Sequence, residues 1–334
     1  MHSATQEVAT SGISDPRREL TALIAGCGIS RLDRALLSLT GRDRVRWLNG
    51  MVSNNIRDLA AGRGVYAFIL TPQGHILADL YAFNRGESLL VETDRAQLET
   101  LLSVFRKYII MDKVEIEDRS ETFAVLSLSG PKSNDVLASL GLNTNLEPLQ
   151  ISETHWNGLG ITLVRGDNPC FPTFEIWIPA ESATTLTSQL LQAGVETVQE
   201  QTLETFRILC GIPQVGRDIR ERILPQETGQ ERALNFTKGC YIGQEIVERI
   251  RSRGAVHRIF VGFEVEGPAP TPGTKVQSEG KEVGEVTSIA AAPLKGKRLA
   301  LGFLRKEFTS ADKELTAGDA KLKAVPLPFA SIFS

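Results

Sequence analysis

The sequence has little net charge, few aromatic residues and no long apolar segment. Its 334 residues carry a net charge of -3, and no apolar run approaches the ~20 residues of a membrane-spanning helix. The slightly negative net charge gives no general attraction for the phosphates of nucleic acids, so we expect no direct nucleic-acid binding. The lack of a long apolar run likewise predicts no membrane partner. With 42% hydrophobic and 23% charged residues, the composition is that of a globular protein, and its length predicts more than one domain.

Cysteine and histidine are also scarce, and neither is arranged as a metal site. The four cysteines lie far apart without a C-x-x-C pair, and the four histidines lack the spacing of zinc ligands. We therefore expect no metal site and no disulfide framework. The N-terminus lacks the basic and apolar regions of a secretory signal, so residues 1–18 are predicted to be a flexible segment of a cytoplasmic protein whose thiols stay reduced.

Strand and helix patterns are mixed through most of the chain. The expected elements are, in order, a helix over 40–59, strands over 65–70 and 76–83 around a turn, a helix after Asp94, strands over 113–117 and 123–128, a short helix from Pro131, strands over 161–164 and 174–178, and a helix over 182–193. The helix after Asp94 has the clearest apolar stripe, at Leu98, Leu101, Leu102 and Phe105. Because strands and helices do not alternate strictly, this order predicts an α+β fold.

The last part of the chain differs in character. Short alternating strands between residues 259 and 304 are separated by turns rich in glycine and proline, which predicts a small β-barrel. We place the boundary near residues 254–258. The predicted organisation is therefore a flexible segment at 1–18, an α+β domain at 19–255 and a C-terminal β-barrel at 256–334.

One octapeptide combines a thiol, two glycines and several polar groups: Lys238, Gly239, Cys240, Tyr241, Ile242, Gly243, Gln244 and Glu245. The helical spacing that follows places Cys240 at or just before a helix N-terminus, beside Lys238. Backbone N–H groups and a cation would both stabilise a thiolate, which predicts a lowered pKa of the Cys240 thiol and a reactive sulfur. A small buried residue in a glycine turn is the alternative, and spacing alone leaves both open.

The octapeptide resembles the signature of the YgfZ-type folate-binding proteins, a branch of the glycine-cleavage T-protein (aminomethyltransferase)-like superfamily. Three other segments resemble motifs of that superfamily: Gly41–Arg44 with Trp47, Leu48 and Ser53–Asn55; Arg207–Pro213 with Gly216 and Asp218; and Leu224–Glu227. The resemblance extends from about residue 31 to residue 329. It implies a three-lobed fold in which two interleaved α+β lobes and a C-terminal β-barrel surround a central hole.

The resemblance also implies a pocket for tetrahydrofolate or a one-carbon derivative. Residues 74–80 resemble a family segment in which an aspartate lies next to the reacting nitrogens of folate, and this aspartate corresponds to Asp79. Tyr66 matches a tyrosine that contacts folate, and we assign Asn54 and Arg207, from the shared motifs, to the same pocket. A carboxylate suits the N–H donors of the pterin, and an aromatic ring can stack on it. Solvent exposure of Asp79 and simple sheet packing of Tyr66 are the alternatives.

One departure from the superfamily pattern concerns pterin recognition. Without gaps, the glutamate with which T-proteins recognise the pterin corresponds to Phe171. A phenylalanine accepts no hydrogen bond from the pterin, so this recognition must be lost, weakened or supplied by another residue. Together with the cysteine motif, Phe171 counts against a true aminomethyltransferase.

The leading hypothesis is a cytoplasmic folate-binding protein that supports iron–sulfur cluster assembly or repair in client enzymes, with an indirect link to tRNA modification. In this hypothesis Cys240 is the reactive thiol, Asp79 lies in the folate pocket, and the partners are iron–sulfur client enzymes or assembly factors. We expect a binding protein more than a conventional turnover enzyme. The alternative is a tetrahydrofolate-dependent aminomethyltransferase or demethylase in which Asp79 assists one-carbon transfer, and a scaffold that has lost its ligand is a third reading.

Overall fold

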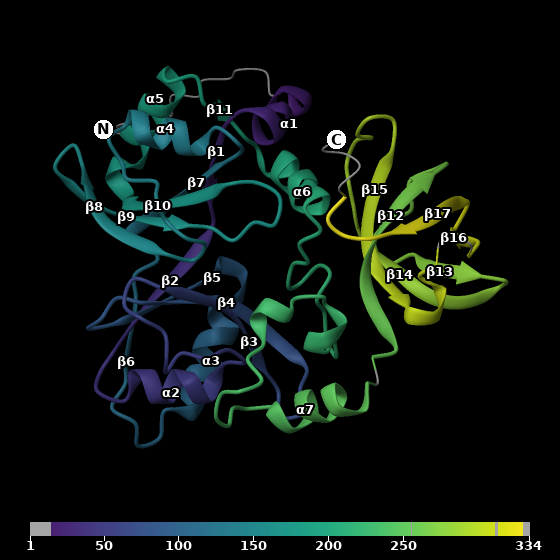
Figure 1. Cartoon of the computed structure of the whole chain (residues 1–334), viewed down its shortest axis with the longest axis horizontal. Helices are drawn as coiled ribbons and strands as arrows, with labels where there is room; N and C mark the ends of the chain where they lie inside the picture. The colour runs from purple at the N-terminus through teal and green to yellow at the C-terminus, as the bar shows by residue number, and fades with distance from the viewer. Residues whose placement is uncertain (1–14, 255, 311–312, 330–334) are drawn as a thin grey trace, which may run out of the picture.

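A computed structural model describes residues 15–254, 256–310 and 313–329. The chain forms two α+β lobes and a closed barrel, which Figure 1 shows as three bodies joined through the helices α6 (Glu200–Leu209) and α7 (Gln244–Arg253). The predicted α+β class with a C-terminal barrel is confirmed. Residues 1–14 of the predicted flexible segment lie outside the described residues, and its last residues begin a helix that Asp15 caps.

The first lobe is built on a six-stranded sheet in the order β11-β1-β7-β10-β9-β8. Its strands are β1 (Gly28–Leu32), β7 (Phe123–Ser129), β8 (Ile151–Trp156), β9 (Leu159–Arg165), β10 (Thr173–Pro179) and β11 (Glu196–Thr197). The helices α1 (Pro16–Ala25), α4 (Ser133–Ser139) and α5 (Ala183–Gln192) lie with α6 around it (Figure 1). Leucines of α5 and alternate residues of β7 and β10 form its apolar core, because one face of each element is apolar.

The second lobe is built on a five-stranded sheet in the order β3-β4-β5-β2-β6. Its elements are β2 (Arg34–Thr40), α2 (Arg44–Met51), β3 (Gly64–Leu70), β4 (Ile76–Asn84), β5 (Leu89–Asp94), α3 (Leu98–Tyr108) and β6 (Glu115–Asp118). The predicted apolar stripe of α3 is confirmed, since all four of its side chains are buried against the sheet. The predicted hairpin is confirmed as β3 and β4.

The barrel closes in the strand order β12-β15-β14-β13-β16-β17. Its strands are β12 (Arg258–Glu266), β13 (Lys275–Ser278), β14 (Lys281–Ile289), β15 (Arg298–Arg305), β16 (Leu315–Ala317) and β17 (Ala320–Val325). The fully buried Asp218 holds the barrel to α6, because it accepts hydrogen bonds from Thr287 and Ser288 of β14 and pairs with Arg207 of α6.

Several expectations about the elements were wrong. The helix expected over 40–59 spans only Arg44–Met51, because Val52 turns to an extended conformation and Ser53 bonds the backbone of β3 instead. The strand expected from residue 113 begins at Glu115. The sequence analysis also missed β1, β2, β5, β8, α1 and α6. The fully buried strands among these, such as β5, have no apolar–polar alternation that would mark them.

The two lobes are interleaved, because the chain passes from the first sheet to the second between β1 and β2 and returns between β6 and β7. β1 ends at Leu32 in the first sheet and β2 begins at Arg34 in the second, so a single residue joins two sheets. An apolar cluster packs the lobes together through Leu36, Phe83 and Leu90 of the second lobe and Val164 and Trp177 of the first. This packing brings polar side chains of β3, β4 and β5 close to those of β10.

No helix among the described residues has the length and hydropathy needed to cross a bilayer.

Candidate functional site

Tyr66 and Asp79 meet on neighbouring strands of the second lobe. The hydroxyl of Tyr66 donates a hydrogen bond of 2.6 Å to Oδ2 of Asp79. Nε2 of Gln97, just before α3, donates to the other carboxylate oxygen over 2.7 Å, and its Oε1 accepts from the Asp79 backbone N–H. Asp79 is half-buried and Tyr66 is 4% exposed. Burial and the Asp79 charge hold the pKa of Tyr66 well above its usual value, so its hydroxyl stays a donor.

Asn54 joins this pair from the loop after α2. Its side-chain amide donates to the Tyr66 carbonyl over 2.8 Å and to the Arg232 carbonyl over 2.9 Å. The guanidinium of Arg232 lies 4.3 Å from the centre of the Tyr66 ring and is ion-paired with Asp167, which also accepts the Tyr81 hydroxyl. Three of the four residues assigned to a cofactor pocket, Asn54, Tyr66 and Asp79, are therefore brought together by the fold.

A buried acidic pair lies beside this group. Glu92 of β5 is 1% exposed, with Nε of Arg34 at 3.1 Å from its Oε1. Burial and the hydrogen-bonded Glu175 of β10 raise the pKa of Glu92 well above its usual value, and the charge of Asp79 adds to this effect. Glu175 is fixed in turn by the indole N–H of Trp177. Carboxyl groups from both lobes thus interact across the interface.

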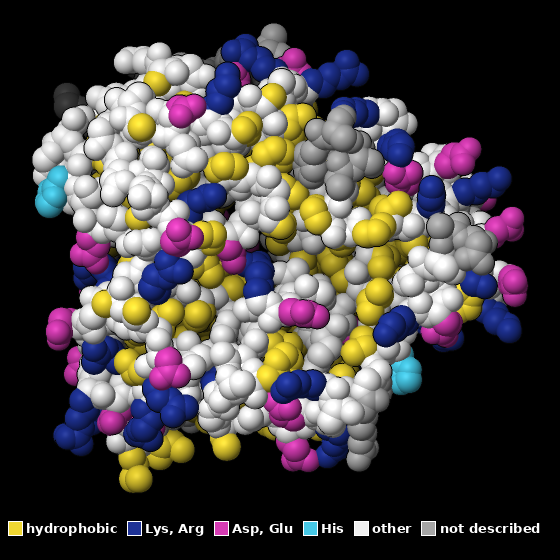
Figure 2. Space-filling view, in the orientation of Figure 1, with side chains coloured by type: hydrophobic (Ala, Val, Ile, Leu, Met, Phe, Trp, Pro, Cys, Tyr) yellow, Lys and Arg dark blue, Asp and Glu magenta, His cyan; other side chains and the backbone are white. Residues whose placement is uncertain are grey.

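The sequence analysis missed Arg34, Tyr81, Glu92, Gln97, Asp167 and Arg232. The sequence analysis assigned no role to Glu175. These residues come from strands and loops far apart in the chain, so no local spacing links them. A charged residue inside an otherwise buried strand, as Glu92 is in β5, was the one signal that could have been used. Figure 2 shows side chains of both charge signs side by side near the middle of the molecule, between the two α+β lobes.

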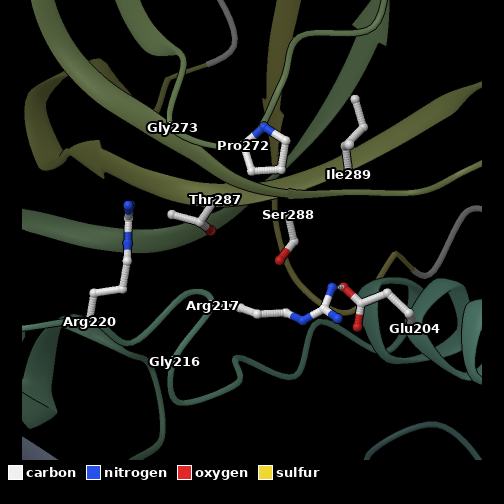
Figure 3. A pocket seen from close by; sticks show the side chains of 9 residues that line it. All are labelled: Glu204, Gly216, Arg217, Arg220, Pro272, Gly273, Thr287, Ser288 and Ile289. Carbon is white, nitrogen blue, oxygen red and sulfur yellow. Dashed lines mark ion pairs between the residues drawn. The ribbon is translucent and has the colours of Figure 1, made fainter.

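Arg207, the fourth predicted cofactor residue, has a different role. Its five N–H donors are all used, by both carboxylate oxygens of Glu204, the Ile212 carbonyl, Asp218 and Ser288. Arg207 therefore joins α6 to the barrel and has no donor left for a cofactor. It lies beside a cavity of about 340 Å³ between the loop after α6 and β14, which includes Glu204 and Ser288 (Figure 3).

The octapeptide forms a loop before α7, and its lysine does not act on its cysteine. The Lys238 ammonium donates to the carbonyls of Asn49, Val52 and Asn54 at 2.5 to 2.7 Å, so its three donors are used. The cation beside Gly239 is Arg57, whose guanidinium nitrogen lies 3.2 Å from where a Cβ on that glycine would be. The prediction that Lys238 activates the thiol is corrected, because the lysine is committed to the segment after α2.

Cys240 is exposed and lies ahead of the helix. α7 begins at Gln244, and its N-cap is Gly243 in a left-handed conformation with φ of +83°. A Cβ at Gly243 would lie 2.6 Å from the Thr71 carbonyl, so the hairpin turn and the octapeptide pack in a way that requires this glycine. Cys240 was predicted at or just before a helix N-terminus, and it lies four residues before the first residue of α7, while the alternative of a buried thiol is wrong. Gln244 accepts the Tyr241 N–H and Glu245 pairs with Arg249.

Two domain profiles match the chain: the GCVT N-terminal domain over residues 18–238 and the glycine cleavage T-protein C-terminal barrel domain over residues 258–329. The chain belongs to the glycine-cleavage T-protein family. The superfamily expected from the motifs is thus confirmed, and the YgfZ-type branch is a finer assignment.

Similar proteins support the family assignment. An aminomethyltransferase of Rubrobacter xylanophilus is 29% identical over 88% of this chain and 80% of its own length. A putative chloroplastic transferase of Arabidopsis thaliana is 25% identical over 85% of this chain, which spans 66% of that protein. The crystal structure of the aminomethyltransferase T of Bartonella henselae has the same fold, with a TM-score of 0.84, 21% identity and coverage of 95% of this chain and 90% of that one.

Phe171 lies apart from the acidic pair in this T-protein-family fold. Its ring stacks on Phe206 of α6 at 5.6 Å and packs against the apolar cluster under α1. Among the described residues, no group of three or more histidine, cysteine, aspartate or glutamate side chains is arranged to hold a metal ion.

Lys238→Met should lower the free energy of unfolding by about 3 kcal/mol, because it leaves buried carbonyl oxygens without a donor. Cys240→Ala, at an exposed position two residues away, should change it by less than about 0.5 kcal/mol. Urea denaturation of both variants measures the difference. Equal stability of the two would show that Lys238 does not hold the loop in place.

Proposed function

We propose that this T-protein-family chain is a cytoplasmic folate-binding protein of the YgfZ type that supports iron–sulfur cluster assembly or repair in client enzymes. The observation that carries the folate proposal is the hydrogen bond from Tyr66 to Asp79. Gln97 donates a second hydrogen bond to the other carboxylate oxygen of Asp79. The proposal assigns residues 19–255 to folate binding and residues 256–334 to the barrel domain. A link to tRNA modification would be indirect, through a client enzyme that contains a cluster.

The chemistry of the donor set fits a reduced folate. The pterin offers several N–H donors, and Asp79 supplies a half-buried carboxylate that can accept from them. Arg232 lies over the buried ring of Tyr66, and its exposed side chain places a cation where a carboxylate-bearing tail could bind. We assign Asp79, Tyr66 and Asn54 to the folate contact.

The loss of the glutamate at Phe171 has a candidate replacement. Burial and the neighbouring carboxylate of Glu175 raise the pKa of Glu92, which favours its protonated form beside Asp79. A protonated carboxyl group can donate a hydrogen bond and a carboxylate can accept one, and a pterin edge offers both donors and acceptors. In the proposed complex this pair takes over the recognition that Phe171 lacks.

Asp79→Asn should weaken tetrahydrofolate binding by about tenfold or more, because it removes the charge that accepts the pterin hydrogen bonds. Anaerobic calorimetric titration of the reduced protein measures the dissociation constant. The control is Asp135→Asn, which changes an exposed carboxylate in the first turn of α4 and should leave binding unchanged. Absence of saturable binding to the unaltered protein, or equal affinity of both variants, would contradict the folate proposal.

The exposure of Cys240 supports a role outside the folate pocket. The thiol lies on the surface, whereas the lysine two residues earlier reaches Asn54, whose side chain bonds Tyr66. The octapeptide therefore places a solvent-accessible sulfur on a loop that is fixed to the pocket. A sulfur in this position can meet a client protein or assembly factor while folate is bound.

Cys240→Ala should reduce the activity of an iron–sulfur client enzyme several-fold in cells that depend on this protein. Tetrahydrofolate affinity and protein abundance should stay unchanged, because the thiol lies outside the pocket. Client activity, abundance and calorimetry in the Cys240→Ala and Asp135→Asn variants test this expectation. Full client activity with Cys240→Ala would show that the thiol has no part in the mechanism, and the folate proposal would be unaffected.

The second candidate function is a tetrahydrofolate-dependent aminomethyltransferase or demethylase. The names of similar proteins favour it, and so does the position of Asp79, which could accept or deliver a proton at the reacting nitrogens.

We expect no methylenetetrahydrofolate when the protein is supplied with tetrahydrofolate and an aminomethyl-loaded carrier protein, because the cysteine octapeptide and Phe171 both depart from the pattern of the enzymes. Chromatographic assay of the folate product, with a bona fide aminomethyltransferase as positive control, measures this. Steady product formation that Asp79→Asn abolishes would establish the enzyme instead.

A further inference from the structure

Two cysteines that are far apart in sequence share one apolar cluster. Cys170 lies in the loop between β9 and β10, and Cys210 is the C-cap of α6. Both pack in the cluster that contains Leu20, Leu23 and Phe206, next to the stacked rings of Phe171 and Phe206. Cys210 is 2% exposed, whereas Cys170 is half-buried and follows the exposed Pro169. One sulfur is thus open to a small reagent and the other is hidden behind it.

Asn168 holds the two thiols in place. Its Oδ1 accepts the backbone N–H groups of Cys170 and Phe171 at 2.8 and 3.1 Å. Its Nδ2 points to the Cys210 sulfur at 3.7 Å. A single amide therefore fixes the backbone of one cysteine and contacts the sulfur of the other, so the two cysteines lie close together.

The loop that carries Cys170 also carries part of the candidate functional site. Asp167, three residues earlier, accepts the Tyr81 hydroxyl at 3.1 Å and pairs with Arg232. A covalent bond at Cys170 would fix this loop to the end of α6.

We propose that Cys170 and Cys210 form a reversible disulfide with a low-molecular-weight disulfide such as oxidised glutathione, and that this bond locks the loop 166–172 onto α6. The inference does not rest on the proposed function, because it concerns the thiol pair alone. Both cysteines contact Asn168 and pack in one cluster, and the irregular loop 166–172 can supply the movement that brings the two sulfurs to the ~2 Å length of a disulfide bond.

The exchange balances in two steps. The Cys170 thiolate attacks one sulfur of oxidised glutathione, which forms a mixed disulfide and releases one glutathione thiolate. Cys210 then loses its proton to solvent, and its sulfur attacks the Cys170 sulfur, which releases the second glutathione. The two protein thiols are oxidised by two electrons and one glutathione disulfide is reduced to two thiols.

The electrostatics of the pair agree with this order of attack. Interaction with the Cys210 thiol lowers the pKa of Cys170, while interaction with Cys170 and burial raise the pKa of Cys210. The half-buried sulfur is therefore the nucleophile and the buried one the resolving thiol. Cys27 does not compete, because burial raises the pKa of its thiol to about 12.

The test uses the full chain with Cys240→Ser, which removes the exposed thiol that would otherwise form mixed disulfides. The reduced protein is equilibrated with glutathione buffers of increasing oxidised fraction, the remaining thiols are trapped with N-ethylmaleimide, and peptides are mapped without reduction. We expect one Cys170–Cys210 peptide, no retained glutathione, and a melting temperature higher by about 5 °C that dithiothreitol reverses.

Amide hydrogen exchange gives a second readout. Exchange across residues 166–172 should slow about tenfold on oxidation, while exchange in the barrel stays the same. Cys210→Ser in the same background should instead retain one glutathione at Cys170, because the resolving thiol is gone. A stable glutathione adduct at Cys170 in the protein with Cys210 intact, or fully reduced thiols at every glutathione ratio, would overturn the proposal.

Discussion

Ionisable groups buried between two sheets must find partners within the protein, and the candidate site depends on this constraint. Burial of an isolated charge costs far more than the free energy of unfolding of a whole domain can offset. Asp79 therefore receives donors at both oxygens, and Glu92 pairs with Arg34 and lies beside Glu175, where burial raises the pKa of Glu92. These contacts form only when the two sheets are packed against each other in the observed arrangement. The crossing between β1 and β2 fixes that arrangement, since it leaves a single residue between the sheets.

Two charged residues outside the acidic cluster are also fully paired within the protein. Lys238 donates its ammonium hydrogens to three carbonyls of the segment after α2, and this ties the cysteine octapeptide to the loop that holds Asn54. Arg207 uses every donor it has to join α6 to Asp218 and the barrel. Residues that looked like cofactor or activating groups in the sequence are thus structural. In the proposed function the chemistry is assigned to Asp79, Tyr66 and the exposed Cys240.

The chain shares the fold of the T-protein family and departs from the family pattern at Phe171. The fold agrees with the aminomethyltransferase T structure over nearly the whole chain. Phe171, where a pterin-binding glutamate was expected, packs instead against Phe206 in an apolar cluster. The same cluster contains Cys170, which lies in the same loop as Phe171, and Cys210, the C-cap of α6. A shared fold with altered loops allows relatives to differ in activity, because function depends on the site more than on the scaffold.

The sequence by itself determined the α+β class, the C-terminal barrel, the apolar stripe of α3 and the hairpin that carries Tyr66 and Asp79. These features depend on local periodicity and turn residues, which one segment can encode alone. Only the tertiary structure decided that Arg207 and Lys238 are saturated by other partners, and that Cys240 is exposed ahead of its helix. It also decided which residues meet: Glu92 with Glu175, Arg232 with Asp167, and Cys170 with Cys210. Contacts between distant segments arise from the packing of whole sheets, and no spacing within one segment records them.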